Sequence, residues 1–190
     1  MSWEPPLRAD AERTHHAILR VADRLLSADP TTTVQQIADA AGVARTTVHR
    51  RFATREALVA AMIDAIMAQV EGAINAARTE TAPPLVALHQ LTANLVTVQS
   101  VWRFTPNRQA LADSRVLTAE EQVRGKSQAL FERITAAGLL DAAVCRDWLT
   151  RVYYALLREA VRERAERGTD VDELADRVVT TLFHGLGRRG

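Results

Sequence analysis

Apolar residues recur every three or four positions along nearly the whole chain, and this is the spacing of α-helices. In the first such stretch Ile18, Val21, Ala22, Leu25 and Leu26 fall on one stripe. Similar stripes follow to near the C-terminus. No run alternates apolar and polar residues between turn signals, as a half-buried strand would. We therefore predict an all-α protein.

The same spacing predicts eight or nine helices. Their starts are expected at side chains that can accept a hydrogen bond from a backbone N–H of the first turn. The expected caps are Thr33 with Gln36, Thr54, Thr118 with Glu121, Asp141, and Asp170. Asp29-Pro30, the segment 80–84, Pro106, Gly138 and Gly168 are expected to end or separate helices.

Composition excludes several classes of protein. The 190 residues include 24 Lys and Arg against 23 Asp and Glu, so the formal charge is only +1 and a histone-like polycation is excluded. One cysteine, Cys145, cannot form an internal disulfide. The first ten residues lack the apolar core of a signal peptide, and no apolar run approaches the length of a membrane span. A cytoplasmic protein with no membrane partner is expected.

Residues 34–52 predict a helix-turn-helix, that is, two short helices joined by a tight turn. Ala38 is small where the second helix must cross closely, and Gly42 permits the positive φ that the turn requires. Ile37, Val43 and Val48 supply the apolar contacts between the two helices. A helix–glycine–helix corner is common in all-α proteins, but unrelated corners seldom satisfy all these positions together.

The stretch 45–55 is basic, with four arginines and no carboxylate. Such a stretch is often only a solvated helix face. Here, however, Thr46 and Thr47 lie in the first turn of the second helix, where recognition helices contact bases. Arginine can bind guanine with two hydrogen bonds, and threonine can bind bases or phosphates. Thr33 and Thr54, at helix N-termini, are expected to contact phosphates.

Two segments resemble the N-terminal domain of TetR-type transcriptional regulators. They are Ile37-Ala38-Asp39-Ala40-Ala41-Gly42-Val43 and Thr47-Val48-His49-Arg50-Arg51-Phe52-Ala53-Thr54-Arg55-Glu56-Ala57-Leu58. The resemblance covers roughly residues 10–60. It implies a three-helix DNA-binding domain, here residues 10–56, followed by a helical effector-binding and dimerisation domain, here residues 57–187. It also implies a homodimer whose last two long helices pair across the interface.

The resemblance assigns the recognition helix to residues 45–52 and phosphate contacts to Thr33, Thr54 and Arg55. With the residues expected to face DNA, the predicted contacts are Thr33, Arg45, Thr46, Thr47, His49, Arg50, Thr54 and Arg55. Three positions depart from the family pattern: Ala44 replaces a capping Ser, His49 replaces Tyr, and Arg55 replaces Lys.

Large side chains in the rest of the chain are candidates for a pocket that holds a small, hydrophobic effector: Met62, Met67, Trp102, Phe104, Trp148, Tyr153 and Tyr154. Asn94, Gln99, Asn107 and Gln128 are polar candidates to orient it. The last two helices carry the candidates for a dimer interface: Trp148, Val152, Leu156, Leu174, Val178 and Leu182. The alternative for each is ordinary core.

These patterns together predict a regulator that binds double-stranded operator DNA as a dimer and is released by an effector. A helical carrier or enzyme with a vestigial helix-turn-helix is the alternative. No nucleophile motif, phosphate loop or dinucleotide fingerprint occurs in the sequence. His15 and His16 are adjacent on a helix, so they are poor joint metal ligands. No cofactor, metal or enzymatic activity is expected.

Overall fold

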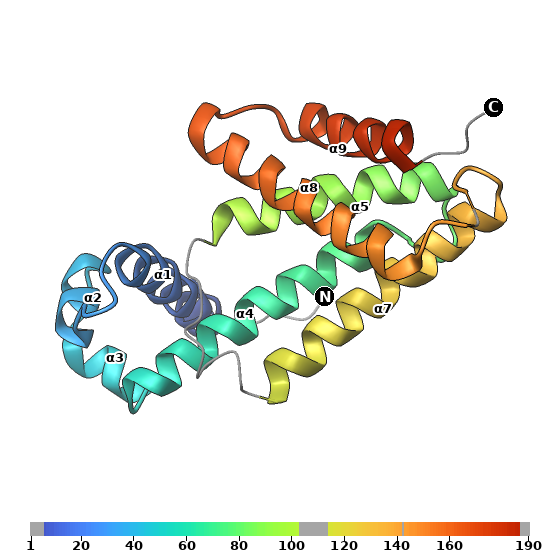
Figure 1. The fold of residues 1–190 in the computed structure, drawn as a ribbon. Helices are drawn as coiled ribbons and strands as arrows, with labels where there is room; N and C mark the ends of the chain where they lie inside the picture. The colour runs from blue at the N-terminus through green and yellow to red at the C-terminus, as the bar shows by residue number, and fades with distance from the viewer. Residues whose placement is uncertain (1–5, 103–113, 142, 187–190) are drawn as a thin grey trace. The chain divides into compact units, whose positions relative to one another are not determined.

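The computed structural model describes residues 6–102, 114–141 and 143–186, and in these residues the chain is helical without strands (Figure 1). The eight helices are α1 (Pro6–Ala28), α2 (Val34–Ala40), α3 (Arg45–Arg51), α4 (Arg55–Ala76), α5 (Pro84–Val101), α7 (Ser114–Ala136), α8 (Arg146–Arg167) and α9 (Val171–Leu186). The predicted all-α class is confirmed.

The chain divides into two compact units, and the division falls inside α4. The first unit holds the described residues up to Ile66, together with Trp102, and the second holds residues 67–101 and those from Ser114 onwards. This division lies further along the chain than the expected boundary after residue 56. Compactness does not show independent folding, so the domains 10–56 and 57–187 stay a prediction.

The first unit is built around a small apolar core. Its largest contributors from α1 are Ile18, Leu19 and Leu26, all buried, because the apolar stripe of α1 faces inward. Buried Ile37 and Val48 come from α2 and α3, and Phe52, Leu58 and Met62 complete the core from the next turns of the chain. The short helices α2 and α3 gain their stability from this packing, since seven-residue helices are marginal alone.

In the second unit, α5, α8 and α9 pack against one another, and α7 packs against α5 and α8 (Figure 1). Tyr153 of α8 lies at the centre and is fully buried. Its ring meets Phe131 of α7 edge-on at 5.3 Å between centroids. Its hydroxyl lies 3.1 Å from Thr92 Oγ1 of α5. The Thr92 hydroxyl donates its one proton to the carbonyl of Leu88, at 2.7 Å, so Tyr153 is the donor to Thr92.

The observed starts and ends of the helices can be compared with the caps expected from the sequence. The box at Thr33, the cap at Thr54 and the cap at Asp170 are confirmed: Thr54 Oγ1 accepts from Ala57 N–H at 3.1 Å, and Asp170 Oδ1 accepts from Asp172 N–H at 2.9 Å. Gly168 ends α8 with a left-handed φ of 68°, as the sequence indicates.

Two other expected caps are wrong. Helix α7 begins at Ser114 rather than Thr118, because nothing in the intervening residues prevents the helix from extending one turn towards the N-terminus. Helix α8 begins at Arg146, because the Asp141 carboxylate accepts from Ala143 N–H at 2.9 Å and closes a turn instead. The residue that precedes α8, Cys145, makes no side-chain cap.

By length and composition alone, α4 is the one helix among the described residues that could cross a membrane. Its mean hydropathy reaches 1.6 over 18 residues. That is more apolar than the sequence expectation allowed, although Asp64 and Glu71 interrupt the run. A single helix of this kind is weak grounds for a membrane span, because core helices pass the same test.

His15 makes the stability of the first unit depend on pH. Its ring lies 5.3 Å from the Phe52 ring, and burial, followed by the charges of His16 and Arg51, lowers its pKa below the ordinary 6.5. When the pH falls below about 6.5, the unfolded chain takes up this proton before the folded chain does, so stability decreases. Above that pH His15 contributes no pH dependence.

We therefore expect His15→Gln to lose less stability than the parent when the pH is lowered from about 7.5 to about 5.5. Urea unfolding at both pH values measures the difference. The same pH dependence in parent and variant would show that His15 titrates alike in the folded and unfolded chains.

Candidate nucleic-acid interface and ligand pocket

The turn between α2 and α3 has the geometry that the sequence predicts for a helix-turn-helix. Gly42 adopts a φ of 66°, in the left-handed region. Its N–H donates to Asp39 O at 3.2 Å, and Val43 N–H donates to Ala38 O at 3.1 Å. Ala38 and Val48 have no exposed surface, so the close crossing of the two helices leaves no room for a larger residue at Ala38.

The two helices of this motif begin differently. At the start of α2, Thr33 N–H donates to Gln36 Oε1 at 2.8 Å and Gln36 N–H donates to Thr33 Oγ1 at 3.3 Å, which is a complete capping box. At the start of α3, Ala44 offers no side-chain acceptor. The N-terminus of the candidate recognition helix is therefore held by packing and not by a cap.

The outer face of α3 is polar and basic. Arg45, Thr46, His49 and Arg50 are all exposed, and their spacing of one and four places them on one side of the helix. Arg45 Nε donates to His49 Nε2 at 3.1 Å, so this His49 nitrogen is unprotonated and accepts. Among the described residues, neither Arg45 nor Arg50 has a carboxylate within salt-bridge distance. Both guanidinium groups can therefore bind an anion such as a phosphate.

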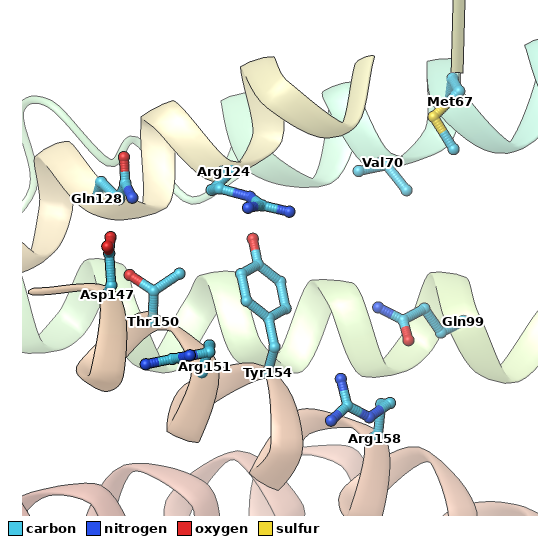
Figure 2. Close-up of a pocket in the computed structure, with 10 residues that line it drawn as sticks. All are labelled: Met67, Val70, Gln99, Arg124, Gln128, Asp147, Thr150, Arg151, Tyr154 and Arg158. Carbon is cyan, nitrogen blue, oxygen red and sulfur yellow. The ribbon is translucent and has the colours of Figure 1, made fainter. Parts of the chain in front are cut away.

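The second unit contains a cavity of about 750 Å³, lined by four helices. Figure 2 shows its lining: Met67 and Val70 of α4, Gln99 of α5, Arg124 and Gln128 of α7, and Asp147, Thr150, Arg151, Tyr154 and Arg158 of α8. This volume lies within the usual range of small-molecule sites. The lining has apolar, hydrogen-bonding and charged members, with three guanidinium groups against one carboxylate.

Comparisons with known proteins agree with this geometry. The sequence profile described as "Bacterial regulatory proteins, tetR family" matches residues 18–62, which span the helix-turn-helix and its supporting helices. The HTH-type transcriptional repressor LfrR of Mycolicibacterium smegmatis is 28% identical over 175 residues, covering 92% of this chain and 91% of LfrR. Residues 18–62 thus match the DNA-binding domain of TetR-family transcriptional regulators, and the chain is similar to LfrR over nearly its whole length.

Solved TetR-family structures extend the likeness to both units. The structure of LfrR from Mycobacterium smegmatis in complex with proflavine has a TM-score of 0.71 and 26% identity, covering 94% of this chain and 99% of that one. The ketosteroid transcriptional regulator KstR2 of Mycobacterium tuberculosis shares the fold, with a TM-score of 0.76 and 19% identity, covering 92% of this chain and 95% of that one. Both of these similar structures are transcriptional regulators.

Within the matched residues 18–62, other residues expected to contact DNA have structural contacts as well. Thr33 is exposed, but its hydroxyl also donates to Gln36 Oε1 at 2.9 Å, so its proton is already used in the capping box. Thr54 is exposed and caps α4. Thr47 is half-buried, unlike Thr46 beside it. Of the eight expected residues, Arg45, Thr46, His49 and Arg50 are the four grouped on the exposed face of α3.

Arg55 holds the loop between α1 and α2. Its Nη1 donates to the carbonyl of Thr32 at 2.5 Å, and its Nη2 donates to the carbonyl of Pro30. The family resemblance implied only a phosphate contact for this residue, because a long-range contact to main-chain carbonyls leaves no local pattern in the sequence. Arg55 thus ties the start of α4 to the residues that precede α2.

Replacing Arg55 should lower stability, whereas replacing Arg50 should not. Arg55→Met keeps most of the aliphatic stem and removes both hydrogen bonds, so we expect the free energy of unfolding to fall by about 1–3 kcal/mol. Arg50→Met is the matched control, because Arg50 is exposed on α3 and its side chain makes no hydrogen bond or salt bridge within the described part of the chain. Urea unfolding compares the two variants. Equal stability of both variants and the parent would show that the Arg55 contacts contribute nothing.

The candidate effector residues are dispersed. Met67 lines the cavity, as do Tyr154, Gln99 and Gln128. Met62 is buried in the first unit, and Tyr153 is core beneath Tyr154, so neither lines the cavity. Trp148 is 52% exposed, and Trp102 is buried outside the lining. Phe104 and Asn107 lie outside the described residues. The sequence expectation also missed the three arginines, since nothing in the sequence distinguishes them from surface arginines.

The candidate dimer residues differ in exposure. Leu174, Val178 and Leu182 of α9 are buried within one copy of the chain, because α9 packs this face on α5 and α8. Their side chains are therefore not available to a second copy in this conformation, and the alternative of ordinary core describes them. Val152 and Leu156 are half-buried, and Trp148 is exposed.

The described residues contain no group of three or more His, Cys, Asp or Glu side chains that could hold a metal ion. Cys145 is exposed.

Proposed function

We propose that this chain is a repressor that binds an inverted-repeat operator as a dimer and releases it when a small molecule enters the cavity. One observation carries the proposal: the same chain holds a helix-turn-helix with an exposed basic face and a separate cavity of about 750 Å³. Helix α4 contributes Leu58 and Met62 to the core of the first unit and Met67 and Val70 to the cavity. It is the element that can couple the two sites.

The DNA contacts follow from the exposed face of α3. Arg45 and Arg50 supply guanidinium groups for guanine edges or phosphates, while Thr46 and His49 supply smaller hydrogen-bonding groups. A dimer presents two such helices on one side of the duplex. The operator should therefore be an inverted repeat whose half-sites lie about one helical turn apart or somewhat more.

Dimerisation is supported by the exposed apolar side chains of the second unit. Trp148, near the start of α8, is 52% exposed, and Val152 and Leu156 of the same helix are half-buried, so this face of α8 can be covered by a partner. We place the interface on the outward faces of α8 and α9. Leu174, Val178 and Leu182 form the monomer core beneath it.

A response to ligand is supported by the cavity and by the similar regulator LfrR. LfrR has been solved in complex with proflavine, so one similar regulator accommodates a small molecule. A ligand that contacts Met67 and Val70 touches α4 directly. If it binds one placement of α4 more tightly than another, it shifts the protein towards that placement and changes the affinity for DNA. The protein would act in the cytoplasm, where bacterial DNA lies.

Selection from a pool of random duplexes tests the proposal. Purified chain is incubated with the pool, bound duplexes are amplified, and the sequences are read after several rounds. We expect an inverted repeat to be enriched. A parallel selection with Arg45→Ala and Arg50→Ala combined should lose it. If the parent chain enriches no sequence, the alternative of a helical carrier with a vestigial helix-turn-helix replaces the repressor.

A further inference from the structure

The cavity of the second unit carries a charge that limits what can bind there. We propose that its ligand is an amphipathic anion, that is, an apolar body bearing a carboxylate, sulfonate or phosphate group. The proposal rests on the proposed function, because it names the chemical class of the effector of that same site. It replaces the expectation of a purely hydrophobic effector.

The charged residues of the cavity follow one stripe of α8. Asp147, Arg151, Tyr154 and Arg158 are separated by four, three and four residues, so all of them point to the same side of the helix. Arg124 enters from α7, and Figure 2 shows its side chain reaching towards the hydroxyl end of Tyr154. The lining therefore collects three positive groups and one negative group around a single space.

Arg124 and Arg158 are the two cations most available to a ligand. In the part of the chain that the structure describes, neither has a carboxylate within salt-bridge distance. Arg151 is held differently, since its guanidinium carbon lies 5.8 Å from the centre of the Trp148 ring. Other arginines of α8 are paired with acids, as Arg162 is with Glu159 at 2.6 Å. Unpaired guanidinium groups beside a cavity favour an anionic ligand group.

The one acid does not neutralise the whole cavity. Asp147 lies in the first turn of α8, where the helix dipole favours a carboxylate. Eleven residues separate it from Arg158, which is about 16 Å along the helix axis. In Figure 2 Asp147 lies near Gln128 at one end of the cavity, and Arg158 lies near Gln99 at the other. The positive potential is therefore concentrated at the middle and the far end.

The rest of the lining suits the apolar body of such a ligand. Met67 and Val70 lie at the same end as Arg158 in Figure 2, and the Tyr154 ring offers an aromatic face between Arg124 and Arg158. Methionine adapts its shape to irregular apolar groups. Gln99, Gln128 and Thr150 add neutral hydrogen-bonding groups. An anion held by Arg124 and Arg158 would thus place its apolar part against α4.

Two fluorescent aromatic amines of opposite charge test the inference. The anion is 1-anilinonaphthalene-8-sulfonate, and the cation is proflavine, which is protonated at neutral pH. Each is titrated into the full-length protein at low salt, and the dissociation constant is obtained from its emission. The double variant Arg124→Gln with Arg158→Gln is compared with the control Arg162→Gln, which makes the same change on α8 outside the cavity.

We expect the parent to bind the sulfonate at least about tenfold more tightly than proflavine, because hydrogen bonds to charged groups are the stronger ones. The double variant should weaken sulfonate binding by about tenfold or more and should not weaken proflavine binding. Arg162→Gln should change neither. The inference would be overturned if proflavine bound the parent as tightly as the sulfonate does. It would also be overturned if the double variant bound the sulfonate as tightly as the parent.

A separate measurement distinguishes this inference from the proposed function. The operator duplex recovered by selection is bound to the protein, and the sulfonate is added. Release of the duplex supports both conclusions. Tight, arginine-dependent sulfonate binding with no release leaves the anionic site standing and contradicts the effector role. Release by proflavine but not by the sulfonate supports the repressor and contradicts an anionic effector.

Discussion

Arg45→Ala should weaken binding to the operator by about 1–3 kcal/mol, which is roughly five- to 150-fold, while leaving the fold intact. Arg45 is exposed in the first turn of α3, where recognition helices reach base edges. It also donates to His49 Nε2 at 3.1 Å, so its loss removes a contact that orients His49 on the same face. The loss of a guanidinium should also reduce the dependence of affinity on salt.

Fluorescence anisotropy with the selected duplex measures this effect. Arg167→Ala is the matched control, because it removes the same charge from an exposed position in the second unit. We expect Arg167→Ala to bind the duplex as the parent does. Parent-like affinity of Arg45→Ala, with its far-ultraviolet circular dichroism unchanged, would show that α3 does not face the operator.

Tyr153→Ala should lower the free energy of unfolding of the second unit by about 3–5 kcal/mol, the usual cost of removing a large buried aromatic side chain. Tyr153 is fully buried between α5, α7 and α8. The ring meets both Phe131 and Tyr154 at centroid distances of 5.3 and 5.4 Å, so its removal leaves a cavity with two aromatic walls. This loss is a large part of the stability of an ordinary domain.

Tyr153→Phe separates the ring from the hydroxyl. The variant keeps the ring contacts and loses one buried hydrogen bond, and Thr92 still donates to Leu88 O, so we expect a loss of only about 0.5–1.5 kcal/mol. Urea unfolding monitored by circular dichroism compares the parent and both variants. Equal losses from the two substitutions would mean that the Tyr153 ring does not contribute to the packing of the second unit.

The helix-turn-helix could be predicted from the sequence because its determinants are local. Gly42 is required by the φ of the turn, and the Thr33–Gln36 box is made by residues three apart. The small side chain of Ala38 also acts within the motif, since it faces the helix that follows directly. Each of these constraints acts between residues that are close in the chain, so it can be recognised in the sequence.

The cavity could not be predicted, because its lining comes from four helices far apart in the sequence. Whether an arginine of α7 or α8 faces this space or the solvent depends on the rotation of each helix, which tertiary packing decides. The same limit explains α9: its apolar stripe fits core and interface equally well in sequence. Packing on α5 and α8 places Leu174, Val178 and Leu182 in the core.

Helix starts illustrate a second limit on prediction from sequence. Asp141 is a good N-cap residue, yet it closes a turn with Ala143, and α8 begins later. Asp side chains stabilise turns and helix starts by the same hydrogen bond to a nearby N–H, so local sequence cannot separate the two. Asp170 makes this bond at a true helix start.

The most direct test of the repressor is a titration of the selected duplex beside a duplex of the same composition in scrambled order, at several salt concentrations. We expect saturation at two chains per duplex and an affinity about 10³-fold or more above that for the scrambled duplex. We also expect the affinity to decrease steeply as salt rises. Equal affinity for both duplexes, or affinity that does not depend on salt, would contradict the proposed repressor.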